Sequence, residues 1–421
     1  MNKFRIVARN LRRRPLATTL TTLSVALGVA LFVTVGALRK AGEEGFKRSA
    51  ALCDLVVGAK GSPLELTLNT MYHMGQSPGN IPFSLWDELG ARDGVKWTVP
   101  LMVGDSWRGW RVIGVTDDLF SQVELSTFGK LKFSSGRPFV YSADDFRHDH
   151  AEIGHQHGGD VEAVVGATTG LEIGFEFHPA HDLRANSEAE QHRELTASVV
   201  GVLAPTGTPL DRAIYIPAGA YWMVEGHQAE ETTTAGGARD PHGVSAVLVR
   251  SKPGFYHIKL WRELNDRLDA QAAQPAIEIR RLFDIVGVAD QALRLVAALV
   301  VAVALAGVLV AVYNTMGSRR REFAVFRALG ASRSTVLFLV VGEAASVAAL
   351  GGITGLLMAG IGVSLASSEL LDRTGVEVSA MPGVSELYLL IMVVGVGALA
   401  GLVPALAAYR TEAARHLSSN L

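Results

Sequence analysis

Four long apolar runs divide the chain, at residues 16–38, 286–313, 335–366 and 387–408. A helix needs about 20 mostly apolar residues to cross about 30 Å of hydrocarbon, so each run is long enough to span a membrane. A cleaved signal peptide has a shorter apolar core, and we therefore expect the first run to be an uncleaved anchor. The pattern predicts a membrane protein with four transmembrane helices.

The stretch between the first two runs, residues 39–285, is polar and mixed. Short β-type segments recur in it, punctuated by Gly, Pro and Asp, which is typical of strands and turns. We expect strands at 54–58, 111–115, 162–166, 198–203, 213–216 and 245–249. Helices are expected at 84–91, 217–226 and 256–273. The stretch is predicted to be a large α+β domain, built as one lobe or two.

Arginine and lysine are distributed unevenly outside the apolar runs. Residues 1–15 hold six cations and no acid, and 314–334 and 409–421 are also basic, whereas 367–386 holds one arginine and four acids. Positive residues in short segments stay on the cytoplasmic side. Both termini are therefore predicted to be cytoplasmic and residues 39–285 to lie outside the cytoplasm. Residues 1–15 are expected to form an amphipathic helix on membrane lipid.

Composition and motifs exclude several classes of protein. Charged residues make up 19% of the chain, against about 25% in soluble domains, and the net charge of −2 gives no indication of nucleic-acid binding. Cys53 is the only cysteine, so no intramolecular disulfide can form, and we expect it to be a packed apolar residue rather than a nucleophile. The chain has no G-x-x-x-x-G-K-[ST] phosphate loop, so we expect it not to hydrolyse ATP alone. We expect no catalytic residues.

The most specific pattern lies between the second and third runs. We expect a basic turn at 318–322, then a short amphipathic helix at 323–329 that is closed by Gly330. Residues 320–333 read Arg-Arg-Glu-Phe-Ala-Val-Phe-Arg-Ala-Leu-Gly-Ala-Ser-Arg. This segment resembles the R-E-x-(apolar)₃-R-A-L-G-A-S/T signature of FtsX/MacB-like permeases, a subunit class of ABC transporters.

Other parts of the chain extend this resemblance. The ending with Gly401, Pro404 and Arg410 is similar to the G-x-x-P-A…A-R ending of that family. Four segments also follow the order of landmarks in the MacB-type periplasmic domain: 136–138, 164–166, 171–174 and 200–203. The resemblance implies an α-helical inner-membrane protein with four transmembrane helices and a large extracytoplasmic α+β domain between the first and second.

The resemblance also implies a function. Members couple ATP hydrolysis by a separate cytoplasmic ATPase, which holds ATP and Mg²⁺, to motion of the periplasmic domain, and so export, extract or deliver a periplasmic substrate. The expected partners are that ATPase, a second copy of the chain or a second permease, and a periplasmic protein or lipoprotein. The residues expected to contact the ATPase are Arg319, Arg320, Arg321, Glu322, Phe323, Phe326, Arg327 and Leu329.

Glu343 lies within the third apolar run. An ionisable residue there is costly and is a functional candidate by default. Its alternative role is structural, as the partner of a basic residue such as Arg333. We favour the structural role, because the sequence offers no second buried carboxylate or histidine for a proton relay.

Histidines are concentrated in one part of the domain. Seven of the twelve lie between residues 148 and 192, and a histidine-rich loop is expected at 144–160. Imidazole and carboxylate groups suit zinc, and His-x-His in an extended segment places both rings on one side. The candidate ligands are His148, His150, His155, His157, His178 and His181. The alternatives are a solvated insertion and a pH-responsive loop.

Two other functions compete with the transporter. A membrane-anchored sensor would bind metal in the outer domain and signal through residues 318–334. An anchored extracytoplasmic enzyme is the weakest interpretation, since the chain lacks G-x-S-x-G and H-E-x-x-H.

Overall fold

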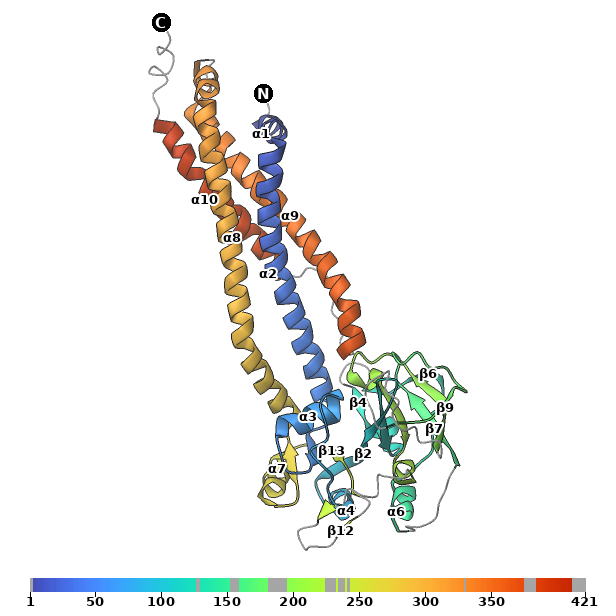
Figure 1. Ribbon diagram of the computed structural model, residues 1–421. Helices are drawn as coiled ribbons and strands as arrows, with labels where there is room; N and C mark the ends of the chain where they lie inside the picture. Colours follow the sequence, from blue (N-terminus) through green and yellow to red (C-terminus); the bar gives the residue numbers. More distant parts are fainter. Residues whose placement is uncertain are drawn as a thin grey trace. The chain divides into compact units, whose positions relative to one another are not determined.

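The computed structural model describes residues 3–125, 129–151, 159–180, 195–223, 232–233, 239–240, 243–328, 331–374 and 384–410 (Figure 1). The chain divides into two compact units. The helical unit comprises Met1–Ala41, Val286–Glu369 and Val378–Leu421. The sheet unit comprises Gly42–Ile285 and Leu370–Glu377.

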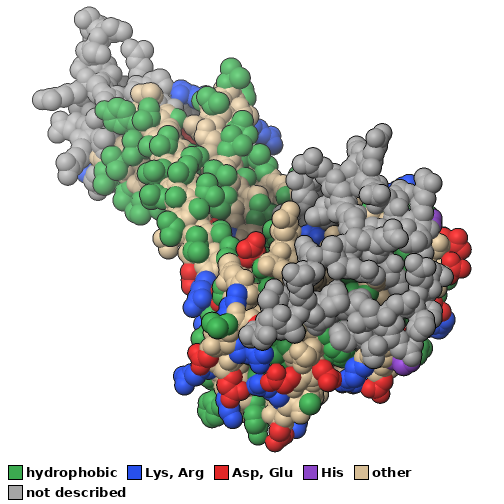
Figure 2. Space-filling view, turned by 60° about the horizontal axis from the view of Figure 1, so that its bottom comes forward, with side chains coloured by type: hydrophobic (Ala, Val, Ile, Leu, Met, Phe, Trp, Pro, Cys, Tyr) green, Lys and Arg blue, Asp and Glu red, His purple; other side chains and the backbone are tan. Residues whose placement is uncertain are grey.

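Long helices make up the helical unit. They are α1 Lys3–Arg12, α2 Pro15–Ala50, α8 Pro275–Ala328, α9 Arg333–Thr374 and α10 Val384–Arg410, and α2 and α8 each contribute residues to both units. Four segments are long and apolar enough to cross a membrane, as the sequence predicts: Pro15–Ala50, Pro275–Asn314, Arg333–Ser367 and Val384–Leu406. Hydrophobic side chains cover the visible face of these helices, whereas charged side chains are scattered over the sheet unit (Figure 2).

Small residues set the packing of the helical unit. A Cβ added at Gly351 or Gly355 of α9 would lie within 3 Å of Val25 or Val29 of α2. Further close approaches join Gly28 to Val301, Gly397 to Ala348 and Gly401 to Ala344. Glycine at these positions therefore allows the backbones of neighbouring helices to approach closely.

The prediction of a basic turn at residues 318–322 is wrong. Residues 318–322 are helical, and α8 continues without a break from the apolar run through the amphipathic segment to Ala328. Arg, Glu and Ala all favour the helix, and the segment contains no proline to stop it. The next helix starts at Arg333, where the hydroxyl of Ser332 accepts a hydrogen bond from the Thr335 amide at 3.3 Å, which is a typical N-cap.

One ten-stranded mixed sheet runs through the sheet unit, in the order β14-β1-β13-β2-β3-β10-β7-β9-β6, with β8 also paired to β9. The strands are β1 Leu55–Gly58, β2 Val95–Trp107, β3 Trp110–Val115, β6 Phe133–Gly136, β7 Gly159–Val165, β8 Glu176–Phe177, β9 Leu195–Leu203, β10 Ala213–Pro217, β13 Ala246–Ser251 and β14 Gln271–Ala273. Two short pairs lie apart from it, β4 Glu124–Leu125 with β5 Gly129–Lys130 and β11 Thr232–Thr233 with β12 Arg239–Asp240. All six predicted strand segments are confirmed.

Helices cover both faces of this sheet. They are α3 Pro63–Tyr72, α4 Phe83–Ala91, α5 Asp118–Gln122, α6 Ala143–Ala151, α7 Tyr256–Asp266, and the 3-10 helices η1 Pro209–Arg212 and η2 Ala218–Met223. Alternate residues of β1 enter different cores, Val56 on one face and Leu55 and Val57 on the other. Burial on both faces explains why β1 is apolar at every position rather than at every second one.

Two helix predictions need correction. The predicted helix at 256–273 ends at Asp266, and its last residues form β14 instead, because pairing with β1 overrides their helix propensity. Of the segment predicted as helical at 217–226, residues 217–223 are described, and Ala218–Met223 form the 3-10 helix η2 rather than an α-helix. The helix at 84–91 is confirmed as α4.

Candidate functional site

The predicted ATPase contacts lie at the end of α8. The backbone of Arg319, Arg320, Arg321, Glu322, Phe323, Phe326 and Arg327 is helical, while their side chains and all of Leu329 lie outside the described structure. Val325, within the same turns, is 52% exposed. The contact residues therefore stay a prediction, placed on the last turns of a continuous helix.

Glu343 of α9 lies beside the corner between α1 and α2. It lines a cavity of about 30 Å³ together with Arg14, Thr18 and Val312. That volume is enough for about one water molecule. Glu343 and Arg14 therefore line the same cavity, while the pairing of Glu343 with Arg333 stays a prediction.

A buried carboxylate links α2 and α8 within the helical unit. Asp290 of α8 is 6% exposed and lies 3.0 Å from Nη1 of Arg39 and 2.9 Å from Nε of Arg294. Arg294 is four residues from Asp290 on the same helix, a spacing that places both side chains on one face. Arg39 was not foreseen, because 251 positions separate it from Asp290 and no local pattern relates them.

Arg250 fastens the end of α2 to the sheet. Its guanidinium donates to Asp54 at 2.7 Å and to the carbonyls of Ala51 at 2.7 Å and Leu52 at 2.8 Å. The carboxylate of Asp54 also accepts the amide of Ser251 at 2.8 Å. Burial alone would raise the pKa of Asp54, but the hydrogen bonds from Ser251 and the charge of Arg250 outweigh it, so the pKa is lowered.

The end of α2 and the start of α8 also meet directly in the sheet unit. The ring of Phe46 stacks on Tyr72 with centroids 4.5 Å apart and packs edge-on against Phe283 at 5.6 Å. Beyond these rings, β1 follows α2 and β14 precedes α8, and the two strands pair with Val56 opposite Ala273. Two membrane helices therefore join neighbouring strands at one edge of the sheet.

The described ends of the histidine-rich tract have regular secondary structure, which corrects the predicted loop at 144–160. Residues 143–151 form α6, and β7 begins at Gly159. Ser142 and Asp145 form a capping box, in which the amide of each residue donates to the side chain of the other. Phe146 is fully buried and stacks on Trp222 with centroids 4.7 Å apart. The S-x-x-D pattern at 142–145 could have identified this helix.

The helix changes the metal hypothesis. His148 and His150 lie on α6, so the extended His-x-His segment expected from the sequence is a helix at this pair. His178 Nδ1 lies 3.1 Å from the Leu195 carbonyl. His155, His157 and His181 lie outside the described residues, as does the side chain of His150. Among the residues described, no group of three potential ligands surrounds a common point, and zinc binding stays a prediction.

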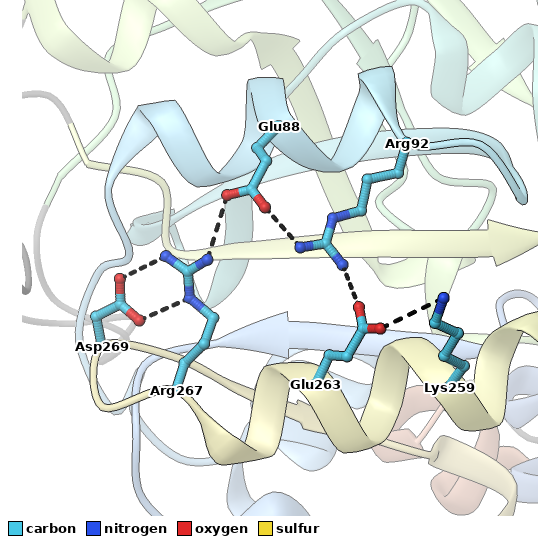
Figure 3. Close-up of polar contacts among 6 residues, drawn as sticks. All are labelled: Glu88, Arg92, Lys259, Glu263, Arg267 and Asp269. Carbon is cyan, nitrogen blue, oxygen red and sulfur yellow. Dashed lines mark hydrogen bonds and ion pairs between the residues drawn. The ribbon is translucent and has the colours of Figure 1, made fainter.

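An exposed ionic network joins α4 to α7 (Figure 3). Arg92 contacts Glu88 at 2.6 Å and Glu263 at 2.8 Å, and Arg267 contacts Glu88 at 3.2 Å. Lys259 and Asp269 are the two ends of the network. A cavity of about 370 Å³ lies beside it, lined by charges that already pair with one another. We interpret the network as a fastening between two helices, of modest energy because it is exposed.

His73 is a titratable group with both ring nitrogens buried, and the sequence did not reveal it. It ends α3 in the left-handed conformation, with φ of 58°. Burial, together with the charges of Arg111 and Arg212, lowers its pKa from 6.5 to about 3. The imidazole is therefore neutral in the folded protein at ordinary pH.

Comparison with known proteins identifies both parts of the chain. A model of the MacB-like periplasmic core domain matches residues 18–278, and a model of the FtsX-like permease C-terminal region matches 294–413. Among solved structures, the periplasmic region of MacB from Actinobacillus actinomycetemcomitans is 12% identical, with 55% of this chain and 92% of that one covered and a TM-score of 0.30. No match was found among curated proteins. Since the MacB-like model spans more than half of the chain, with the four apolar helices and the permease match beside it, the chain belongs to the FtsX/MacB-like permeases of ABC transporters.

Proposed function

We propose that this chain is a mechanical subunit. A separate ATPase binds the α8–α9 segment on the cytoplasmic side and drives movement of the MacB-like domain, which acts on a substrate outside the membrane. Membership of the permease family supports this proposal, as does the lack of a phosphate loop in the chain. ATP and Mg²⁺ belong to the partner, and two copies of the chain form the working unit.

The observation that carries the proposal is the connection of α2 and α8 to neighbouring strands of the sheet. Both helices contribute residues to both units, and they connect to the paired strands β1 and β14. Backbone hydrogen bonds join these strands, and Arg250 holds the last carbonyls after α2. A movement of α2 relative to α8 must therefore deform or turn this edge of the sheet.

The interior of the helical unit also supports movement rather than conduction. Its buried cluster consists of Val, Ala and Leu side chains from α2, α8, α9 and α10. The cavity beside Glu343 has room for about one water molecule. We propose that the substrate is handled by the outer domain and does not pass between these helices.

A co-purification experiment tests the ATPase contact. The full chain would be expressed with its candidate ATPase, as the native protein and with Arg320, Arg321 and Glu322 changed to Ala. We expect the variant to lose most of the ATPase from the complex. The matched control changes Lys252, Lys259 and Arg262 of the sheet unit to Ala and should retain it. Equal recovery in both variants would contradict the proposed contact, and no complex with any ATPase would favour the membrane-anchored sensor.

The same complex tests the link to zinc. We propose that zinc bound by the histidine tract regulates the cycle, and we expect ATPase activity to respond to zinc. Changing His148, His150, His155 and His157 together to Ala should abolish the response without lowering basal activity. If zinc does not change the ATPase activity with either the native chain or the histidine variant, the histidine tract has no role in the ATPase cycle.

A further inference from the structure

The apolar side of α1 packs against protein. Val7 is 5% exposed, and a Cβ added at Gly342 of α9 would lie 3.5 Å from its side chain. Leu11 packs against the buried cluster of the helical unit. The amphipathic pattern of α1 thus serves to attach it to the bundle, which was not foreseen from the sequence.

Three arginines lie on the opposite side of α1. Arg5, Arg9 and Arg12 are all exposed, and their spacing of four and three residues places them within about 60° of one another around the helix. No described residue forms an ion pair with any of the three, and residues 1–15 contain no acid. We call Arg5, Arg9 and Arg12 the arginine stripe.

The start of α2 fixes the depth of the arginine stripe. Pro15 begins α2, and Leu16, the next residue, is 85% exposed. Exposed leucines then continue at intervals of three or four along the same helix: Leu20, Leu23, Leu27 and Leu31. Such a surface belongs in contact with acyl chains. Since it begins directly after the α1–α2 corner, α1 lies at the level of the lipid headgroups.

We propose that the arginine stripe binds the headgroups of anionic phospholipids in the leaflet where α1 lies. Guanidinium groups form paired hydrogen bonds with phosphate, and an anionic surface strengthens association by roughly fivefold for each nearby cation. The lipid is favoured over a protein partner because the stripe adjoins a lipid-facing surface and is not covered by the bundle. The proposal does not depend on the ATPase contact.

Lipid selectivity of the full chain tests the proposal. The protein would be placed in nanodiscs of mixed phosphatidylcholine and phosphatidylglycerol. Native mass spectrometry of the protein released from the nanodiscs would then count the bound molecules of each lipid. We expect enrichment of phosphatidylglycerol that falls at least severalfold in R5Q/R9Q/R12Q. R5K/R9K/R12K should keep most of it, because the charge remains. The matched control K252Q/K259Q/R262Q removes three cations from the sheet unit and should leave the enrichment unchanged.

Three outcomes would overturn the proposal. One is equal enrichment in the native protein and R5Q/R9Q/R12Q, with both equally stable to heat. Another is displacement of the lipid by inorganic phosphate at the same ionic strength, which would indicate a site for free anions. The third is unchanged enrichment with loss of the ATPase from R5Q/R9Q/R12Q, which would assign the stripe to that protein.

Discussion

Arg39 of α2 and Asp290 of α8 form an ion pair of 3.0 Å between two membrane helices. Asp290 is almost fully buried, whereas Arg39 keeps 35% of its side chain exposed. Such a pair fixes the relative position of the helices at one level, because burying the carboxylate without its partners is costly. It lies between the two helices whose relative movement we propose to drive the domain.

Replacing Arg39 by Gln should destabilise the chain by roughly 1–3 kcal/mol, less than for a fully buried pair because Arg39 reaches solvent. Thermal unfolding in detergent would measure the loss. R39Q/D290N removes both charges and should recover part of it. If R39Q unfolds at the same temperature as the native protein, the ion pair does not stabilise the fold.

Gly355 is expected to be required for the contact between α2 and α9. A Cβ there would lie 2.7 Å from the carbonyl oxygen of Ala26, so Gly355→Ala should cost about 1–3 kcal/mol through overpacking. Gly360 lies on the same helix with nothing within 4 Å of an added Cβ. Gly360→Ala should be neutral or stabilising, since alanine favours a helix. Equal unfolding temperatures for the two variants would refute this packing argument.

Arg250→Gln should uncouple the domain. It removes the ion pair with Asp54 and two hydrogen bonds to carbonyls at the end of α2, at a cost of roughly 2–3 kcal/mol. The measurement is the change in distance between spin labels on α2 and on the sheet when the partner ATPase is trapped with vanadate. We expect the change to shrink in R250Q but not in Lys252→Gln, whose pair with Asp93 is exposed.

The result also separates two failures. If the native complex shows no distance change, the proposed mechanical function is wrong. If the change is present and survives in R250Q, movement is transmitted but not through Arg250.

The lowered pKa of Asp54 makes the stability of the chain depend on pH. The stabilisation that the Asp54 carboxylate provides is complete above the ordinary pKa of the group and is lost as pH falls through the lowered value.

His73 should make the folded chain sensitive to acid. Its pKa is about 3 in the folded protein and 6.5 by default, so between these values the unfolded chain binds a proton that the folded chain does not. Stability is therefore complete above pH 6.5 and falls by up to roughly 1.4 kcal/mol per pH unit below it. His73→Asn keeps a residue type that tolerates positive φ but removes the titratable ring. Stability of this variant should therefore depend less on pH between about 3 and 6.5. The same slope in both proteins would contradict the assignment.

The family motif and the apolar runs are sufficient to predict the architecture correctly. The four spans follow from run length, and the strands β1, β3, β7, β9, β10 and β13 follow from short apolar segments between turns. The errors arise where two local signals compete. Residues 318–322 resemble a turn because they are charged, but their helix propensity and the preceding helix carry α8 through them.

The sequence by itself determined which segments enter the membrane, which form strands, and which family the chain resembles, because these properties depend on residues close together in the chain. Only the tertiary structure decided that Arg39 meets Asp290, that Arg250 holds the end of α2, and that β1 pairs with β14. Each of these contacts joins positions about 200 residues apart or more. They form because packing of the apolar faces brings the segments together, and a local pattern carries no information about which partner that packing supplies.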